Sequence, residues 1–186
     1  AGNSDGATIV VIQEIFGVNA VMRGWCDFFA AQGFMAISPD LFWRQEPGIQ
    51  ITDQSQAEWD KAFSLYQGFN EAKGIDDLFV TLAYLREYPG CTGKAGAVGF
   101  CLGGKLAYLM ATRTSCDVSV GYYGVGIEND LGEATAITKP LILHIAEKDG
   151  YCPPEAQAKI KAGLEHNPLV TLHTYPNVDH AFARKG

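Results

Sequence analysis

The chain has 186 residues, of which 47% are hydrophobic and 19% charged, and its formal net charge is −7. This length and composition predict a globular protein of one domain, residues 1–186, with one substantial core. No lysine or arginine cluster stands out against the acidic background, which excludes a nucleic-acid surface. No stretch approaches the ~20 apolar residues of a membrane helix, so we expect neither nucleic acid nor membrane as a partner.

The five cysteines are odd in number and irregular in spacing, and they include no Cys-x-x-Cys pair. This pattern indicates neither a zinc site nor a disulfide framework. We therefore expect reduced thiols, a cytoplasmic location and no metal or organic cofactor. No signal-peptide pattern opens the chain. Both ends look clipped, because there is no initiator Met, an apolar run begins by Thr8 and the chain stops at Gly186.

Short apolar runs alternate with longer segments of helical periodicity. Several runs are almost continuously apolar, which is typical of parallel strands covered on both faces. The predicted strands are residues 8–13, 34–38, 95–100, 118–123, 141–146 and 170–175. The predicted helices are residues 19–33, 57–70, 75–88, 103–112 and 153–166, and residues 45–56 are predicted to be a surface loop. This alternation predicts an α/β fold, a mostly parallel sheet between helices on both faces, in three layers.

One cysteine lies where such folds place a nucleophile. Residues 99–103 (GFCLG) have the form Gly-x-Cys-x-Gly directly after a predicted strand and before a predicted helix. This is the nucleophile elbow of the α/β-hydrolase fold, with Cys101 in place of serine. The glycines allow the tight turn, and the following helix directs N–H groups towards the sulfur, which favours a thiolate or an oxyanion.

A nucleophile at an elbow needs a histidine base and a carboxylate that orients it, in the chain order nucleophile, acid, base. Of four histidines, only His180 lies in a loop just past the last predicted strand. Asp149 follows the strand before it and is the predicted acid, with Glu147 and Asp179 as weaker rivals. The three residues stand at three strand ends in the required order, which predicts a Cys-His-Asp triad.

With these residues in place, the sequence resembles the dienelactone hydrolase family, the carboxymethylenebutenolidases, over essentially the whole chain. The resemblance is carried by residues 13–17 (QEIFG), 38–45 (SPDLFWRQ), 99–104 (GFCLGG), 121–124 (GYYG), Asp149 and residues 180–184 (HAFAR). It implies an α/β-hydrolase fold and a hydrolase that opens dienelactone-type enol lactones to the maleylacetate type of product, through a thioester on the cysteine.

The resemblance also implies roles that spacing alone would not select. Glu14 matches a glutamate that interacts with the resting thiol and helps to generate the thiolate once substrate binds. The backbone N–H groups of Ile15 and Leu102 match the oxyanion hole. The residues matched to substrate binding are Arg44 and Arg184, which would grip a substrate carboxylate, and Tyr123 and Trp43, which would line the pocket.

One position departs from the family, because Ala181 stands where relatives carry serine after the catalytic histidine. The missing hydroxyl puts the identity of the acidic substrate in doubt. We expect a small lactone or ester carrying a carboxylate as the partner, and a monomer. Two alternatives stay open: a carboxylesterase or thioesterase of broader specificity with the same triad, and a catalytically silent relative that only binds ligands.

Overall fold

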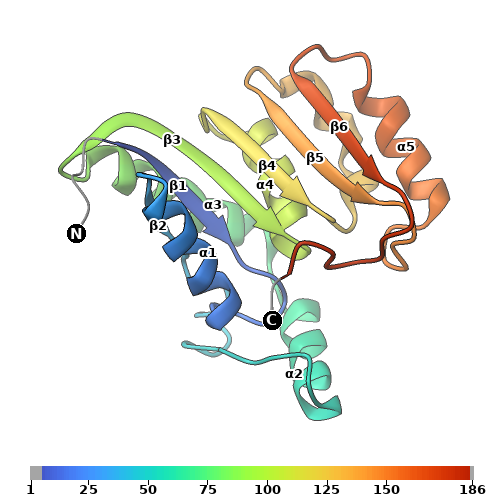
Figure 1. The fold of residues 1–186 in the computed structure, drawn as a ribbon, viewed down its shortest axis with the longest axis horizontal. Coiled ribbons are helices and arrows are strands. Elements are labelled where there is room, and N and C mark those ends of the chain that lie inside the picture. The colour runs from blue at the N-terminus through green and yellow to red at the C-terminus, as the bar shows by residue number, and fades with distance from the viewer. Residues whose placement is uncertain (1–5, 185–186) are drawn as a thin grey trace.

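The computed structural model describes residues 6–184, and its centre is a sheet of six strands (Figure 1). The strands are β1 (Gly6–Ile12), β2 (Met35–Ile37), β3 (Cys91–Phe100), β4 (Val118–Tyr122), β5 (Leu141–Ala146) and β6 (Val170–Tyr175). Their order across the sheet is β2-β1-β3-β4-β5-β6, and every neighbouring pair is parallel. The carboxyl ends of the strands therefore lie at one edge, and the predicted triad residues follow β3, β5 and β6 there.

The helices are α1 (Ala20–Ala31), α2 (Gln56–Gln67), α3 (Glu71–Glu87), α4 (Leu102–Arg113) and α5 (Pro154–Leu164), with short 3-10 helices η1 (Ile127–Asn129) and η2 (Leu131–Ala136). Three of them begin at a residue whose side chain accepts hydrogen bonds from the first turn, which stabilises the start of the helix: Asn19, Ser55 and Asn70. No helix in residues 6–184 combines the length and apolar character needed to cross a membrane.

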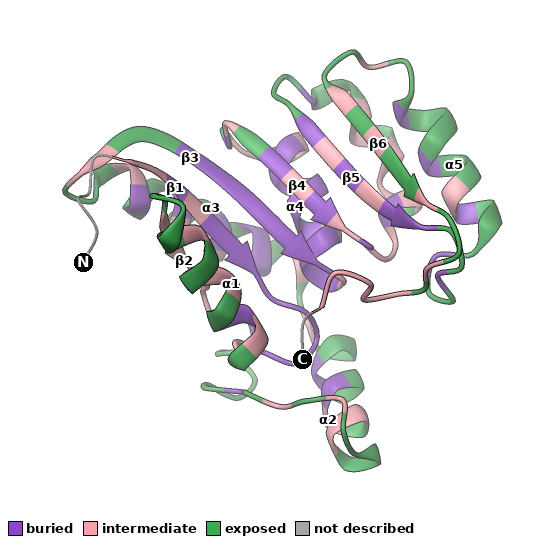
Figure 2. Ribbon diagram, in the orientation of Figure 1, coloured by how far each residue is buried: buried purple, intermediate pink, exposed green. Residues whose placement is uncertain are grey.

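Helices cover both faces of the sheet, which confirms the predicted three-layer α/β architecture. On one face, α3, α4 and α5 bury Leu82, Leu106 and Ile160 in the larger core cluster. On the other face, α1 buries Met22 against Val98 in a smaller cluster. The layer formed by α1 covers less of the sheet than the layer formed by α3, α4 and α5. Exposed residues run along β6 on the face seen in Figure 2.

All six predicted strands are present, and their boundaries differ from the prediction where apolar patterning gives no signal. β3 begins at Cys91, four residues before the predicted start, because its first part is paired with the start of β1 but is largely exposed. α3 likewise begins at Glu71, four residues early, where Asn70 caps it. The predicted surface loop after β2 is irregular as far as Ser55 and leads into α2, which projects below the carboxyl ends of β1 and β3 (Figure 1).

Candidate active site

Cys101 is the single residue between β3 and α4. Its backbone has φ 55° and ψ −116°, a region that residues with a side chain rarely adopt. A Cβ atom on Gly99 would lie 1.8 Å from the carbonyl oxygen of Gly103, and one on Gly103 would lie 2.4 Å from that of Ile12. Both positions therefore require glycine, and the structure has the tight strand-to-helix turn that the sequence predicts.

The thiol of Cys101 is neutral at rest. Burial, and after it the nearby Glu14 carboxylate, raise its pKa to about 12. The backbone N–H of Leu102, at the start of α4, and the guanidinium of Arg184 act in the opposite direction without cancelling this rise. The thiol therefore stays protonated at neutral pH as long as its surroundings do not change.

Cys101 opens into a narrow cavity of about 50 Å³ at the carboxyl edge of the sheet. The backbone segments predicted to form the oxyanion hole, at Ile15 and Leu102, line it, and so does His180. The remaining lining residues are Phe16, Trp59, Phe63, Tyr66, Val125, Tyr151 and Arg184. The predicted nucleophile, base and oxyanion-hole residues thus share one small cavity.

Asp149 is the carboxylate that holds the ring of His180. Its Oδ2 lies 2.8 Å from Nδ1 of the imidazole, and its side chain is almost fully buried. Its other oxygen accepts the backbone N–H of Tyr151 at 2.9 Å. The ring of His180 also packs edge-on against Tyr123 and Tyr151, with centroids 5.0 and 4.9 Å away. These contacts fix the imidazole with Nδ1 towards the acid, which leaves Nε2 for proton transfer.

The two rival acids bind backbone groups instead. Oδ1 of Asp179 accepts the N–H of His180 itself at 2.6 Å, which is a local turn contact. Oε2 of Glu147 accepts the N–H of Asn177 at 2.8 Å. Neither contact reaches the imidazole, whereas Asp149 contacts its Nδ1 directly.

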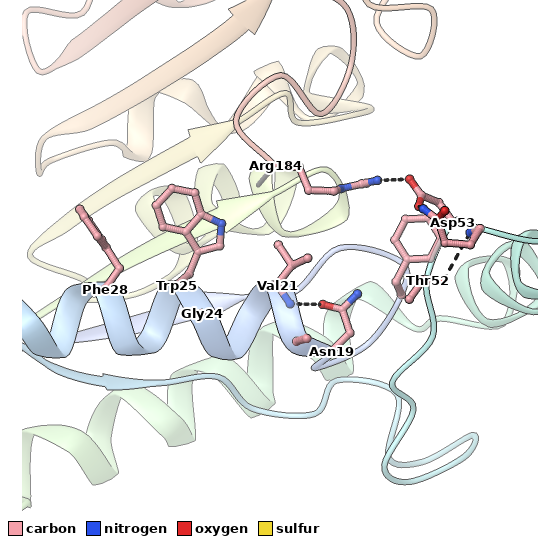
Figure 3. Close-up of a pocket in the computed structure, with 11 residues that line it drawn as sticks. Asn19, Val21, Gly24, Trp25, Phe28, Thr52, Asp53 and Arg184 are labelled. Carbon is pink, nitrogen blue, oxygen red and sulfur yellow. Dashed lines mark hydrogen bonds and ion pairs between the residues drawn. The ribbon is translucent and has the colours of Figure 1, made fainter. Parts of the chain in front are cut away.

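Glu14 and Arg184 form a buried ion pair beside Cys101. Glu14 is 2% exposed, and its Oε2 lies 3.0 Å from Nε of Arg184. The Nε–H bond of Arg184 does not point at Oε2 of Glu14, so this contact is an ion pair without a hydrogen bond. Neither Glu14 oxygen has a hydrogen-bond partner among the described residues. Nη1 of Arg184 meets Oδ2 of Asp53 at 2.5 Å, at the edge of a second and larger cavity beside α1 (Figure 3). Glu14 is therefore a buried carboxylate with unused acceptor capacity next to a thiol.

Arg44 and Trp43 do not line the cavity of Cys101. The guanidinium of Arg44 forms an ion pair with Asp77 and stacks over the ring of Trp43, 4.4 Å from its centroid. The indole N–H of Trp43 also donates to Asp77, at 3.2 Å. The structure thus brings Arg184, but not Arg44, to the predicted nucleophile.

Tyr123 lies behind the imidazole and does not line the cavity. It is 2% exposed and has a positive φ of 39°. Burial raises its pKa, and the neighbouring Glu14 carboxylate raises it further. Tyr123 therefore remains a neutral phenol that packs against His180 and lies near Glu14.

Comparison with known proteins places this chain in a family. A model of the dienelactone hydrolase family matches residues 2–186. The chain belongs to the dienelactone hydrolase family. Within residues 6–184 there is no cluster of three or more His, Cys, Asp or Glu that could hold a metal ion.

Named relatives agree with the family assignment. A putative carboxymethylenebutenolidase of Azospirillum brasilense is 51% identical over 194 residues, which cover 100% of this chain and 80% of the relative. A carboxymethylenebutenolidase of Pseudomonas putida is 40% identical over 176 residues, covering 95% and 75%. The crystal structure of a putative dienelactone hydrolase from Klebsiella pneumoniae superposes with a TM-score of 0.82 at 25% identity, covering 97% of this chain and 79% of that one. The chain is thus an α/β hydrolase of the carboxylic ester hydrolase class.

Two features of this candidate site are absent from the sequence-based prediction. Asp53, in the loop before α2, holds Arg184 from the side opposite Glu14. Trp59, Phe63 and Tyr66 form one wall of the cavity. The second feature had a signal, because these three aromatic residues recur at i, i+4 and i+7 in a predicted helix. The first had none, because a loop aspartate gives no indication of its partner.

Replacing Glu14 with Gln is expected to speed alkylation of Cys101 by iodoacetamide at pH 8. Removing the carboxylate lowers the thiol pKa. Each unit by which this pKa falls raises the thiolate fraction about tenfold, as long as the pH is well below the pKa. Peptide mass spectrometry must assign the modified cysteine, since Cys26 and Cys91 are free and partly exposed and can also react. Glu165→Gln, at an exposed helix end, is the matched control. An unchanged alkylation rate in Glu14→Gln would show that Glu14 does not control the thiol.

Proposed function

We propose that this chain hydrolyses enol lactones and related esters with Cys101 as nucleophile, His180 as base and Asp149 as orienting acid, through a thioester. The observation that carries the proposal is the 2.8 Å contact between Nδ1 of His180 and Oδ2 of Asp149 beside the strained elbow of Cys101. Every group involved comes from one chain, so the proposal treats a monomer as sufficient.

In the first half-reaction, the thiol proton of Cys101 passes to the Glu14 carboxylate. The thiolate then adds to the ester carbonyl, and the backbone N–H groups of Ile15 and Leu102 stabilise the resulting oxyanion. Collapse breaks the carbon–oxygen bond, and the ring oxygen leaves with the electron pair as an enolate, which takes up the proton that Glu14 accepted. The acyl group remains on the sulfur as a thioester.

In the second half-reaction, His180 takes a proton from water and the hydroxide adds to the thioester carbonyl. The carbon–sulfur bond breaks, the product acid is released, and the thiolate recovers its proton from the imidazolium. Asp149 stabilises the imidazolium that forms between these steps. An enolate leaves more readily than an alkoxide, which suits a thiolate nucleophile that is itself a good leaving group.

A substrate carboxylate, if present, would bind Arg184 in this scheme. Its arrival would weaken the ion pair between Arg184 and Glu14, which leaves Glu14 free to accept the thiol proton. Arg44 would join only after moving away from Asp77. Ala181 provides no hydroxyl to such a group. The structure therefore supports one arginine of the expected pair better than the other.

A hydrolysis screen tests the proposed function. The enzyme is expected to open an enol lactone with kcat/KM at least roughly tenfold above that of an ethyl ester of the same acid, about 1.4 kcal/mol of barrier. Product acid is measured by pH-stat, and the Cys101→Ala variant serves as the blank. Equal turnover by Cys101→Ala would refute the nucleophile assignment, and a preference for the ethyl ester would refute the leaving-group argument.

A further inference from the structure

The cavity of Cys101 has an aromatic wall on α2. Trp59, Phe63 and Tyr66 lie at i, i+4 and i+7 on one side of this helix and all line the cavity. Phe63 is 37% exposed and Tyr66 is 38% exposed, although large apolar side chains are usually buried. Exposed aromatic side chains gathered around a nucleophile indicate a surface kept open for a ligand.

The aromatic wall is held in place by its own packing. Trp59 stacks on Phe63 with ring centroids 5.5 Å apart and meets Phe16 edge-on at 5.1 Å. Its indole N–H donates to the backbone carbonyl of Asp53 at 3.1 Å. Trp59 and Phe63 are therefore held in place before a ligand arrives, and a ligand need not order them on binding.

Tyr151 closes the cavity from the side of the triad. It is 49% exposed, and its ring stands edge-on to the imidazole of His180. The space between the two sides is only about 50 Å³. So small a space favours a thin ligand group over a bulky one.

The cavity offers little free positive charge. Among the described residues that line it, Arg184 is the one arginine or lysine, and its guanidinium already faces the carboxylates of Glu14 and Asp53. Arg44 is paired with Asp77 away from the cavity. A substrate carboxylate would have to compete with two carboxylates for one cation and would lose its hydration among aromatic rings.

We propose that the substrate group beside the reacting carbonyl is a planar, neutral, unsaturated or aromatic ring, and that Trp59, Phe63 and Tyr66 select it. Aryl esters without a carboxylate are then better substrates than their carboxylated counterparts. This inference rests on the proposed function. The same chemistry applies, because the thiolate adds to the carbonyl, the carbon–oxygen electron pair leaves with a phenolate, and the phenolate takes up a proton.

Three acetate esters test the inference: phenyl acetate, 4-carboxyphenyl acetate, and vinyl acetate, which has an enol leaving group without a ring. Each kcat/KM is divided by the rate constant of the same ester with hydroxide, which removes differences in intrinsic reactivity. Phenyl acetate is expected to exceed each of the others by about tenfold, as stacking on an aromatic wall and the cost of burying a carboxylate predict.

Variants connect this preference to the aromatic wall. Trp59→Ala is expected to lower the corrected kcat/KM for phenyl acetate about tenfold and to change that for vinyl acetate far less. Phe79→Ala removes an exposed aromatic ring from α3, outside the cavity, and is expected to change neither. Circular dichroism and Tm show whether Trp59→Ala is folded, and Tyr66→Ala provides a second test.

The outcomes separate the two proposals. Preference for 4-carboxyphenyl acetate, together with loss of all activity in Cys101→Ala, would overturn the neutral-ring inference and leave the cysteine mechanism standing. Parallel losses on phenyl and vinyl acetate in folded Trp59→Ala and Tyr66→Ala would also overturn it. Hydrolysis that persists in Cys101→Ala would instead overturn the proposed function.

Discussion

Replacing His180 with Ala is expected to lower kcat for an enol lactone by roughly 10³- to 10⁴-fold, as the loss of a triad base does in other hydrolases. The imidazole is the one group lining the cavity, in the described part of the chain, that is placed to take a proton from water and is also held by a buried acid. Glu14 can accept the thiol proton but cannot serve both half-reactions. Hydrolysis of the thioester, the second half-reaction, should therefore slow the most in His180→Ala.

His166 provides the matched control for this prediction. Its side chain is 89% exposed at the end of α5, so His166→Ala is expected to leave kcat unchanged. Asp149→Asn should show an intermediate loss, because the amide leaves the ring in place but does not stabilise the imidazolium. Steady-state kinetics on the three purified variants would decide the point, and similar rates for His166→Ala and His180→Ala would count against the triad.

Replacing Gly99 with Ala is expected to destabilise the protein by about 3 kcal/mol or more, at the upper end of overpacking effects. The added methyl group would meet the carbonyl oxygen of Gly103 at 1.8 Å. Backbone atoms of β3 and α4 must move apart to relieve this contact, and Cys101 lies between them. We therefore expect activity to fall together with stability.

Gly24→Ala is the control, because it makes the same chemical change in a place with room for it. A Cβ atom on Gly24 has no neighbour within 4 Å, and the residue lies inside α1. Alanine there should raise the free energy of unfolding by about 0.5–1 kcal/mol through its better helix propensity. Urea denaturation of both variants would measure the contrast, and an equally small effect at Gly99 would contradict the account of the turn.

Much of this fold can be read from the sequence because its signals are local. The strands around residues 95–100 and 141–146 are short apolar runs that need burial on both faces, and each is followed by a helix with a visible apolar face. Cys101 carries its own marker in the glycines of the turn. Asp149 and His180 follow because parallel strands place their carboxyl ends at one edge, where the two side chains meet.

The rest of the site depends on the path of the segment between β2 and α2, which local patterns do not determine. Arg44 is expected near substrate from the family resemblance, yet Asp77 holds it elsewhere. Asp53 lies in the polar loop predicted only to be exposed, yet it contacts Arg184, 131 residues along the chain. Such pairings arise from tertiary contacts between distant segments, and no periodicity in the sequence marks them.

The central claim is that Cys101 carries the acyl group during turnover, and the mass of the acid-quenched His180→Ala variant tests it most directly. With hydrolysis of the thioester slowed, incubation with an enol ester should add the mass of one acyl group to the peptide that contains Cys101. Neutral hydroxylamine should remove this mass, and the double variant Cys101→Ala/His180→Ala should never acquire it. Two results would contradict the mechanism, provided that the wild-type enzyme turns the substrate over. One is His180→Ala with no acyl group on Cys101, and the other is an acyl group on a different residue.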